Sequence, residues 1–135
     1  MTNPSFEDHA LVMNVNYDGI VYTVSAATAA IVKAKGAIVL IGTQCIGSAN
    51  VPPSSLDPVA FQSNMIAPGT IQTPMYAPEK LGPEAMAMDA ELRGRTPIKR
   101  IGTADEVANV ARLLLSDDAS YITGAVIVVD GGLTV

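Results

Sequence analysis

Asn64-Met65-Ile66-Ala67-Pro68-Gly69-Thr70-Ile71-Gln72-Thr73-Pro74-Met75 is the stretch that decides the fold of this chain. A short apolar run leads into Pro68-Gly69, where the backbone has to turn, and two threonines follow before a second proline. This order predicts a strand whose carboxyl end opens into a loop. In open α/β sheets ligands bind beyond such strand ends, so the loop would offer its backbone to a planar, amide-bearing group. A plain strand-to-loop turn gives the same pattern, and spacing alone favours it.

The composition favours an α/β protein. Hydrophobic residues make up 49% of the 135 positions, aromatic residues only 4%, and tryptophan is absent. The core must therefore consist mainly of aliphatic side chains, as is usual for a parallel sheet covered by helices. A chain of this length predicts one domain with a buried core.

Charge and cysteine content argue against several kinds of partner and site. Eight Lys and Arg against thirteen Asp and Glu give a net charge of -5, and no basic run could follow a phosphate backbone, so we expect no nucleic-acid partner. Cys45 is the only cysteine and His9 the only histidine, so neither a disulfide framework nor a set of zinc ligands is expected. The polar start of the chain and its short apolar runs predict a cytoplasmic protein that does not enter a membrane.

Three apolar runs predict the strands of the sheet. They are Ala37–Ile41, Ser63–Ala67 and Val126–Val129. A long helix is expected to begin after a Ser5 cap and to end at Gly36.

A second helix has a clearer signal. It follows the capping box Thr103–Glu106 and is expected to end near Ser116. Its apolar stripe consists of Val107, Val110, Ala111, Leu114 and Leu115. A smaller helical segment is expected between Tyr76 and Gly94, with Glu84–Leu92 as its best-defined part.

Four more segments carry patterns that are weak alone. They are Val15–Gly19, Gly36–Thr43, Pro97–Ala108 and Tyr121–Gly132. In this order, and together with the opening stretch, they resemble the short-chain dehydrogenase/reductase family over nearly the whole chain. The resemblance implies an α/β fold with part of a Rossmann-like, doubly wound parallel sheet of about three strands.

The resemblance covers only the carboxyl-terminal half of a family member. It implies that the amino-terminal βαβαβ half, whose glycine-rich turn holds the cofactor diphosphate, has no counterpart here. It also implies that the crossover helix with its Tyr-x-x-x-Lys pair is missing, because residues 44–62 contain neither Tyr nor Lys and have the composition of turns. We therefore expect residues 1–135 to form a single truncated domain.

Two residues of the family's catalytic site have counterparts, Asn16 and Thr43. Asparagine is a poor helix former, so Asn16 needs a hydrogen-bond partner inside the predicted helix. A neighbouring backbone carbonyl or a buried water would satisfy it, whereas the resemblance implies a water that relays protons. The Thr43 hydroxyl would bind the substrate carbonyl or hydroxyl by resemblance, or else cap the loop that follows.

The resemblance implies that the opening stretch binds the nicotinamide end of NAD or NADP. Pro68 and Gly69 would form the floor under the ring. The Ile71 backbone would meet the carboxamide, and Thr73 would offer its hydroxyl to the carboxamide or diphosphate.

The segment after this loop resembles the family's mobile substrate-binding flap, although an amphipathic surface helix explains its sequence better. Tyr76 precedes Lys80 by the same four-residue step as the family's catalytic pair. We interpret that spacing as coincidence, because a loop tyrosine lacks the rigid placement that proton transfer needs.

By resemblance, the chain is an NAD(P)-dependent oxidoreductase that transfers a hydride between the cofactor and an alcohol or carbonyl of a small metabolite. Without the Tyr-x-x-x-Lys pair and the glycine-rich loop, we expect it to be impaired or inactive as an isolated chain. The alternatives are a non-catalytic remnant that acts as an oligomerising or partner-dependent subunit, and a truncated gene product. An open sheet edge would favour association with a second copy or with a complete family member.

Overall fold

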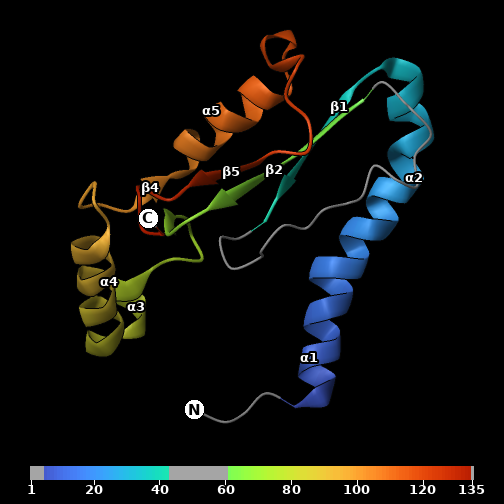
Figure 1. The fold of residues 1–135 in the computed structure, drawn as a ribbon. Helices are drawn as coiled ribbons and strands as arrows, with labels where there is room; N and C mark the ends of the chain where they lie inside the picture. Colours follow the sequence, from blue (N-terminus) through green and yellow to red (C-terminus); the bar gives the residue numbers. More distant parts are fainter. Residues whose placement is uncertain (1–4, 43–60, 135) are drawn as a thin grey trace. The chain divides into compact units, whose positions relative to one another are not determined.

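The computed structural model describes residues 5–42 and 61–134, which divide into two compact units, Met1–Gly36 and Ala37–Val135. The first unit is one helical run (Figure 1). It consists of α1 (Phe6–Met13), a π-helical turn η1 (Asn14–Asp18) and α2 (Gly19–Ala34). The long helix expected from the sequence is therefore confirmed, with a π-helical interruption that the sequence pattern did not predict.

Local hydrogen bonds explain where this helix begins and ends. The Asp8 amide donates to Ser5 Oγ over 3.1 Å and the Ser5 amide donates to Asp8 Oδ2 over 3.0 Å, which completes the predicted capping box. At the other end, where the helix was expected to end at Gly36, it is Lys35 that caps α2 in the left-handed conformation, with φ 51°. The Gly36 amide then donates to the Ile31 carbonyl over 3.0 Å.

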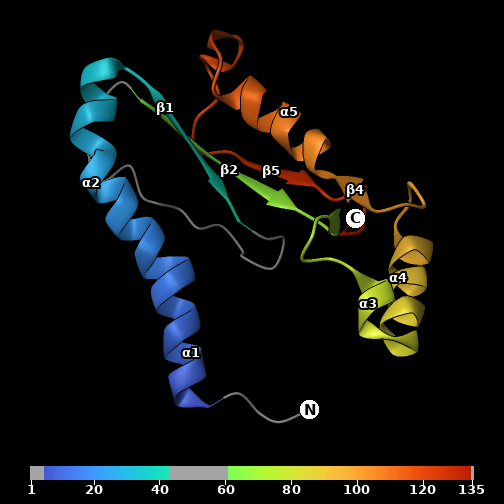
Figure 2. The ribbon, with the colours of Figure 1, turned by 180° about the vertical axis from the view of Figure 1, so that it is seen from behind.

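The second unit is built on a three-stranded parallel sheet with the order β1-β2-β5 (Figures 1 and 2). The strands are β1 (Ala37–Ile41), β2 (Gln62–Pro68) and β5 (Val126–Val129). The central strand β2 buries four consecutive residues, Asn64–Ala67, because it has a neighbour on both sides. The predicted α/β fold and its three strands are confirmed.

Helix α5 (Ala104–Leu114) covers one face of the sheet (Figures 1 and 2). The centre of this core consists of Ile66, Leu114 and Ala119, which are 0%, 1% and 0% exposed, and Ala119 comes from the short helix η3 (Asp117–Ala119). Partly buried side chains around it are Val39, Val107, Val110, Ala111, Ile122, Ile127 and Val129. The predicted apolar stripe is wrong at Leu115, which caps the helix and is 56% exposed, because a step of one residue rotates it away from Leu114.

A buried asparagine joins the central strand to the chain segment that precedes β5. Asn64 Nδ2 donates to the Ile122 carbonyl over 2.9 Å, and Asn64 Oδ1 accepts from the Ala125 amide over 3.1 Å. Gln62 Nε2, on the same face of β2, also donates to the Ile122 carbonyl over 3.2 Å. The buried polar side chain is thereby satisfied, and β5 is held in register beside β2.

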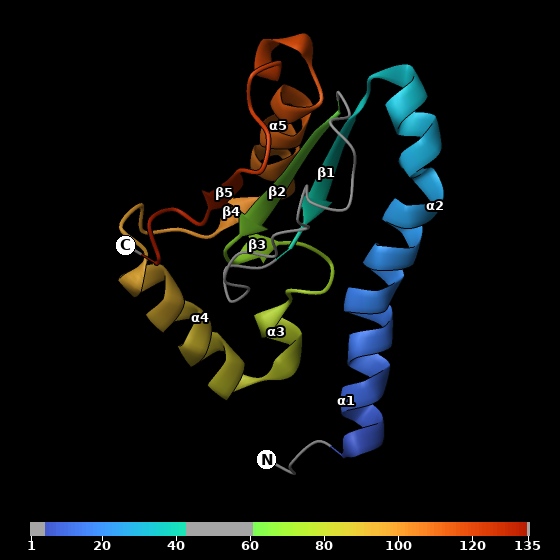
Figure 3. The same ribbon diagram turned by 45° about the vertical axis from the view of Figure 1, so that its right-hand side comes forward.

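Beyond the carboxyl end of β2 lie smaller elements (Figure 3). They are β3 (Ile71–Gln72), α3 (Pro78–Leu81), α4 (Pro83–Arg95) and β4 (Gly102–Thr103). The helical segment expected around Glu84–Leu92 is confirmed as α4, whereas the parallel pair β3-β4 was not predicted. Within the described ranges, no helix has both the length and the apolar character to span a membrane.

The core assignment predicts different effects for two adjacent leucines of α5. Leu114→Ala should lower the free energy of unfolding by about 2–5 kcal/mol, because it leaves a cavity against the sheet. Leu113→Ala makes the same chemical change at a side chain that is 46% exposed and should cost roughly 0.5 kcal/mol or less. Urea unfolding of both variants checks this, and equal losses would contradict the packing of α5.

Candidate functional site

A cavity of about 660 Å³ opens at the carboxyl ends of β1 and β2. Its walls come from the ends of both strands, the loop after β2 and the first turn of α5. The lining residues are Ile41, Gly42, Pro68, Gly69, Thr70, Ile71, Thr73, Met75, Tyr76, Ala104 and Val107. None of these side chains is charged, so the cavity offers apolar surface and hydroxyl groups to a ligand.

The Pro-Gly turn owes its geometry to the neighbouring strand β5. The Gly69 amide donates to the Val129 carbonyl over 3.0 Å, which extends the pairing of β2 and β5 into the turn. A Cβ atom on Gly69 would lie 2.6 Å from Asp130 Cβ and 2.8 Å from Asp130 Cα. Only glycine allows the two backbones to approach so closely. Packing against Asp130 therefore requires glycine at position 69 whether or not a ligand binds.

Asp130 is itself fixed by the turn that follows β5. Its carboxylate accepts hydrogen bonds from the Gly132 amide over 2.8 Å, the Thr134 amide over 2.9 Å and Thr134 Oγ1 over 2.7 Å. Burial acts to raise the pKa of Asp130, but the hydrogen bonds from Thr134, Gly132 and Leu133 outweigh it and hold the pKa below its ordinary value. The residue that packs against Gly69 is therefore a rigid part of the site.

The loop after the turn is held by the short ladder of β3 and β4. Ile71 pairs with Gly102, and the Gly102 amide donates to the Thr70 carbonyl over 3.0 Å. This pairing fixes the backbone around Ile71 at the cavity wall. Further along, the Tyr76 amide donates to the Thr73 carbonyl over 2.9 Å, which closes a turn.

The start of α5, which brings Ala104 and Val107 to the cavity, depends on Glu106. Its carboxylate accepts from Arg100 over 2.8 and 2.6 Å and from the Thr103 amide over 2.8 Å. The hydrogen bonds from Arg100 and then from the Thr103 backbone lower the pKa of Glu106 to about 2. The capping box predicted from the sequence is thus confirmed, and Arg100 reinforces it.

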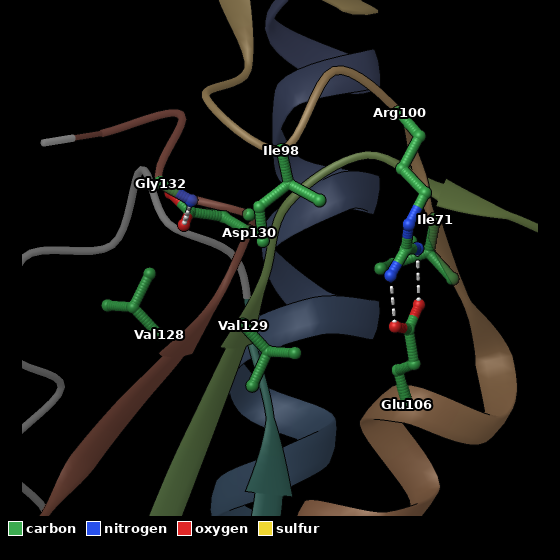
Figure 4. A pocket seen from close by; sticks show the side chains of 10 residues that line it. Ile71, Ile98, Arg100, Glu106, Val128, Val129, Asp130 and Gly132 are labelled. Carbon is green, nitrogen blue, oxygen red and sulfur yellow. Dashed lines mark hydrogen bonds and ion pairs between the residues drawn. The ribbon is translucent and has the colours of Figure 1, made fainter.

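A second, smaller cavity of about 250 Å³ lies beside the Arg100–Glu106 pair (Figure 4). Figure 4 shows these two side chains facing each other on one side of it, with Ile98 and Asp130 on the other. The carboxylates of Glu106 and Asp130 already accept the hydrogen bonds described above. This cavity therefore resembles a packing gap more than a ligand site. In the part of the chain that the structure describes, no three His, Cys, Asp or Glu side chains gather as metal ligands would.

Four predicted cofactor residues, Pro68, Gly69, Ile71 and Thr73, come together in the larger cavity. Asn16 belongs to the other unit, where it lies in the π-helical turn and its Nδ2 donates to the Val12 carbonyl of α1 over 3.0 Å. This contact satisfies one hydrogen atom of the Asn16 amide group, and the proton-relaying water implied by resemblance stays a prediction.

Some predicted site residues lie outside the described residues, and some residues that line the cavity were not predicted. Thr43 and the turn-like segment up to residue 60 lie outside them. Ile41, Ala104 and Val107 also line the cavity and were not predicted, although Ala104 and Val107 lie in the first turn of α5, next to the predicted capping box.

The comparisons with known proteins show the family to which this fold belongs. The sequence model of a family described as enoyl-(acyl carrier protein) reductase matches residues 54–134, more than half of the chain. A solved short-chain type dehydrogenase/reductase from Mycobacterium ulcerans superposes with a TM-score of 0.82 at 28% identity, covering 98% of this chain and 54% of its own. This chain belongs to the short-chain dehydrogenase/reductase family. The resemblance inferred from the sequence is therefore confirmed.

Two curated relatives extend the comparison. The 3-oxoacyl-[acyl-carrier-protein] reductase FabG of Buchnera aphidicola is 32% identical over 153 aligned positions, which cover 98% of this chain and 60% of that protein. A tropinone reductase homolog of Datura stramonium is 30% identical over 154 positions, covering 99% of this chain and 57% of that protein. The chain thus spans somewhat more than half the length of these two relatives.

The Arg100–Glu106 contact predicts a pH-dependent stability. Because the folded-state pKa of Glu106 is about 2 against an ordinary 4.5, its contribution is fully present above about pH 4.5 and is lost as the pH falls toward 2. Glu106→Gln should therefore be less stable than the natural chain at pH 7, and this gap should shrink between pH 5 and 3 in urea unfolding. Both side chains are partly exposed, so added salt should also shrink it.

Glu91→Gln is the matched control for this measurement. The Glu91 carboxylate lies 3.9 Å from Arg95, and both side chains are mostly exposed. Its removal should change stability little at any of these pH values. A Glu106→Gln gap that stays constant or widens on acidification would contradict the assignment.

Proposed function

We propose that the cavity beneath the Pro68-Gly69 turn is the nicotinamide end of an NAD(P) site, in an oxidoreductase that acts on an alcohol or carbonyl of a small metabolite. The observation that carries this proposal is the gathering of Pro68, Gly69, Ile71 and Thr73 around one uncharged cavity at the carboxyl ends of parallel strands. When bound, the nicotinamide supplies or accepts the hydride.

The cavity walls suit a flat, amide-bearing ring. Pro68 and Ile71 offer apolar surface against which the ring can lie, while Thr70 and Thr73 bring hydroxyl groups and backbone for its carboxamide. The turn needs no rearrangement on binding, because Asp130 and the β3-β4 ladder already hold it. A preformed wall lowers the entropy that a ligand loses on binding.

The 135-residue chain is proposed to be impaired or inactive by itself in this chemistry. Carbonyl reduction needs a proton as the hydride arrives, and a positioned acid is worth roughly 10²–10⁴-fold in rate. The sequence offers no Tyr and no Lys between residues 44 and 62, where the family's pair would stand. Tyr76 is the tyrosine at the cavity wall, but its hydroxyl donates to Asp89 over 2.8 Å.

A second candidate function is that of a non-catalytic subunit that associates with another copy or with a complete family member. Strand β5 favours this alternative, because it lies at the edge of the sheet among the described strands and its Val126 and Val128 are 40% and 50% exposed. A truncated gene product would expose the same surface. For either function we propose a cytoplasmic location, which fits a sequence with a single cysteine.

Calorimetric titration with NADH and NADPH distinguishes a site that holds the whole cofactor from one that contacts only its nicotinamide end. We expect the 135-residue chain to bind either cofactor no more tightly than in the millimolar range, because a nicotinamide contact alone lacks the helix terminus that holds a diphosphate. In a screen of carbonyls and alcohols with both cofactors, turnover should stay at background. Micromolar binding of either cofactor, or turnover that survives purification, would contradict the proposal that the chain is impaired or inactive.

A further inference from the structure

Helix α4 buries little apolar surface, and its Ala85 and Leu92 are only partly buried. None of its described residues is buried, and Met86 and Met88 are more than half exposed. Figures 1 and 3 show α3 and α4 side by side beyond the carboxyl ends of the sheet strands. Polar contacts should therefore contribute much of what fixes α4 next to the loop that forms the cavity wall.

A chain of three side chains makes that connection. Tyr76 lies in the loop after the Pro-Gly turn and is one of the residues that line the larger cavity. Its hydroxyl donates to Asp89 Oδ1 over 2.8 Å, and Asp89 Oδ2 accepts from Arg93 Nε over 2.7 Å. Asp89 and Arg93 occupy consecutive turns of α4, and the Asp89 side chain is only 16% exposed. Hydrogen bonds to an ionised group are among the stronger ones in proteins.

We propose that Tyr76, Asp89 and Arg93 form a latch that holds α4 against the cavity loop and so sets the position of this wall. The three are positioning residues, and their role goes beyond the proposed function because it does not require a bound cofactor. Tyr76 thus lines the cavity and also reaches α4 through its hydroxyl. Any ligand that displaces Tyr76 therefore strains the hydrogen bond to α4, and release of α4 frees this part of the wall.

The ionisation of these groups supports the latch. Burial raises the pKa of the Tyr76 phenol, and the hydrogen bond and negative charge of Asp89 raise it further against the opposing charge of Arg93. Hydrogen bonds from Arg93 and Tyr76 hold the pKa of Asp89 below its ordinary value. At neutral pH the Tyr76 phenol therefore donates to an ionised Asp89 carboxylate, as a structural link requires. The raised pKa also makes the phenol a weaker acid than an ordinary tyrosine.

Hydrogen exchange on the full chain tests the latch, with Tyr76→Phe as the variant. Phenylalanine keeps the aromatic ring and removes only the hydroxyl that donates to Asp89. Amide exchange in α4, residues 83–95, should become about tenfold faster, the scale of one lost hydrogen bond to a partly exposed charged group. Exchange in α5, residues 104–114, should stay unchanged, and Asp89→Asn should act in the same direction as Tyr76→Phe.

Tyr121→Phe is the matched control, because Tyr121 is fully exposed. It should leave exchange in α4 unchanged. Unchanged exchange of α4 in Tyr76→Phe, or equal acceleration of α4 and α5, would overturn the proposal.

Tyrosinate absorbance gives a second readout. The chain has four Tyr and no Trp, so the ionisation lost in Tyr76→Phe can be assigned by difference. It should occur above tyrosine's ordinary pKa of about 10 and move downward in Asp89→Asn. If Asp89→Asn left the pKa of Tyr76 unchanged, this result would contradict the role of Asp89 in the latch.

Discussion

The close approach of Gly69 to Asp130 is the contact on which the rest of the site depends. A methyl group at position 69 would meet the Cα and Cβ atoms of Asp130 at well under contact distance, and Asp130 is held in turn by the amides and hydroxyl that follow β5. The backbone therefore leaves the central strand in one direction only. That direction carries Thr70 and Ile71 to the β3-β4 ladder and opens the larger cavity between this loop and α5.

This arrangement separates two parts of the family's chemistry. The binding of a planar nicotinamide ring calls for a rigid, uncharged wall with a few hydroxyl groups, and the described residues supply one. Proton transfer calls for an acid of suitable pKa aimed at the reacting oxygen, and the tyrosine at this wall is instead hydrogen-bonded to Asp89 on α4. A chain that can bind the ring but cannot deliver the proton would keep the shape of the site and lose most of the reaction rate. This is the reason for proposing that the chain is impaired or inactive by itself.

Most of the fold could be predicted because its signals are local. In the capping boxes at Ser5 and Thr103, the two hydrogen-bonded residues are three positions apart in the sequence. The strands can be recognised as short apolar runs. The misses involve contacts between distant positions. Gly69 has the pattern of a turn residue, yet the atoms that require glycine belong to Asp130. The two-residue strands β3 and β4 are too short for any periodicity. The hydrogen bond from Tyr76 to Asp89 joins a loop to a helix, so no spacing rule predicts it.

The central claim is that the Gly69–Asp130 contact shapes a cavity for the nicotinamide end of the cofactor. The most direct test is a backbone amide NMR titration of the full chain with reduced nicotinamide mononucleotide at millimolar concentration, on the natural chain, Gly69→Ala and Gly94→Ala. A Cβ at Gly94 meets nothing within 4 Å, so this helix variant should bind as the natural chain does. The account predicts perturbed amides around Gly42, Gly69, Ile71 and Thr73 in those two proteins, and their loss in a still folded Gly69→Ala. No perturbation there, or the same pattern in Gly69→Ala, would contradict it.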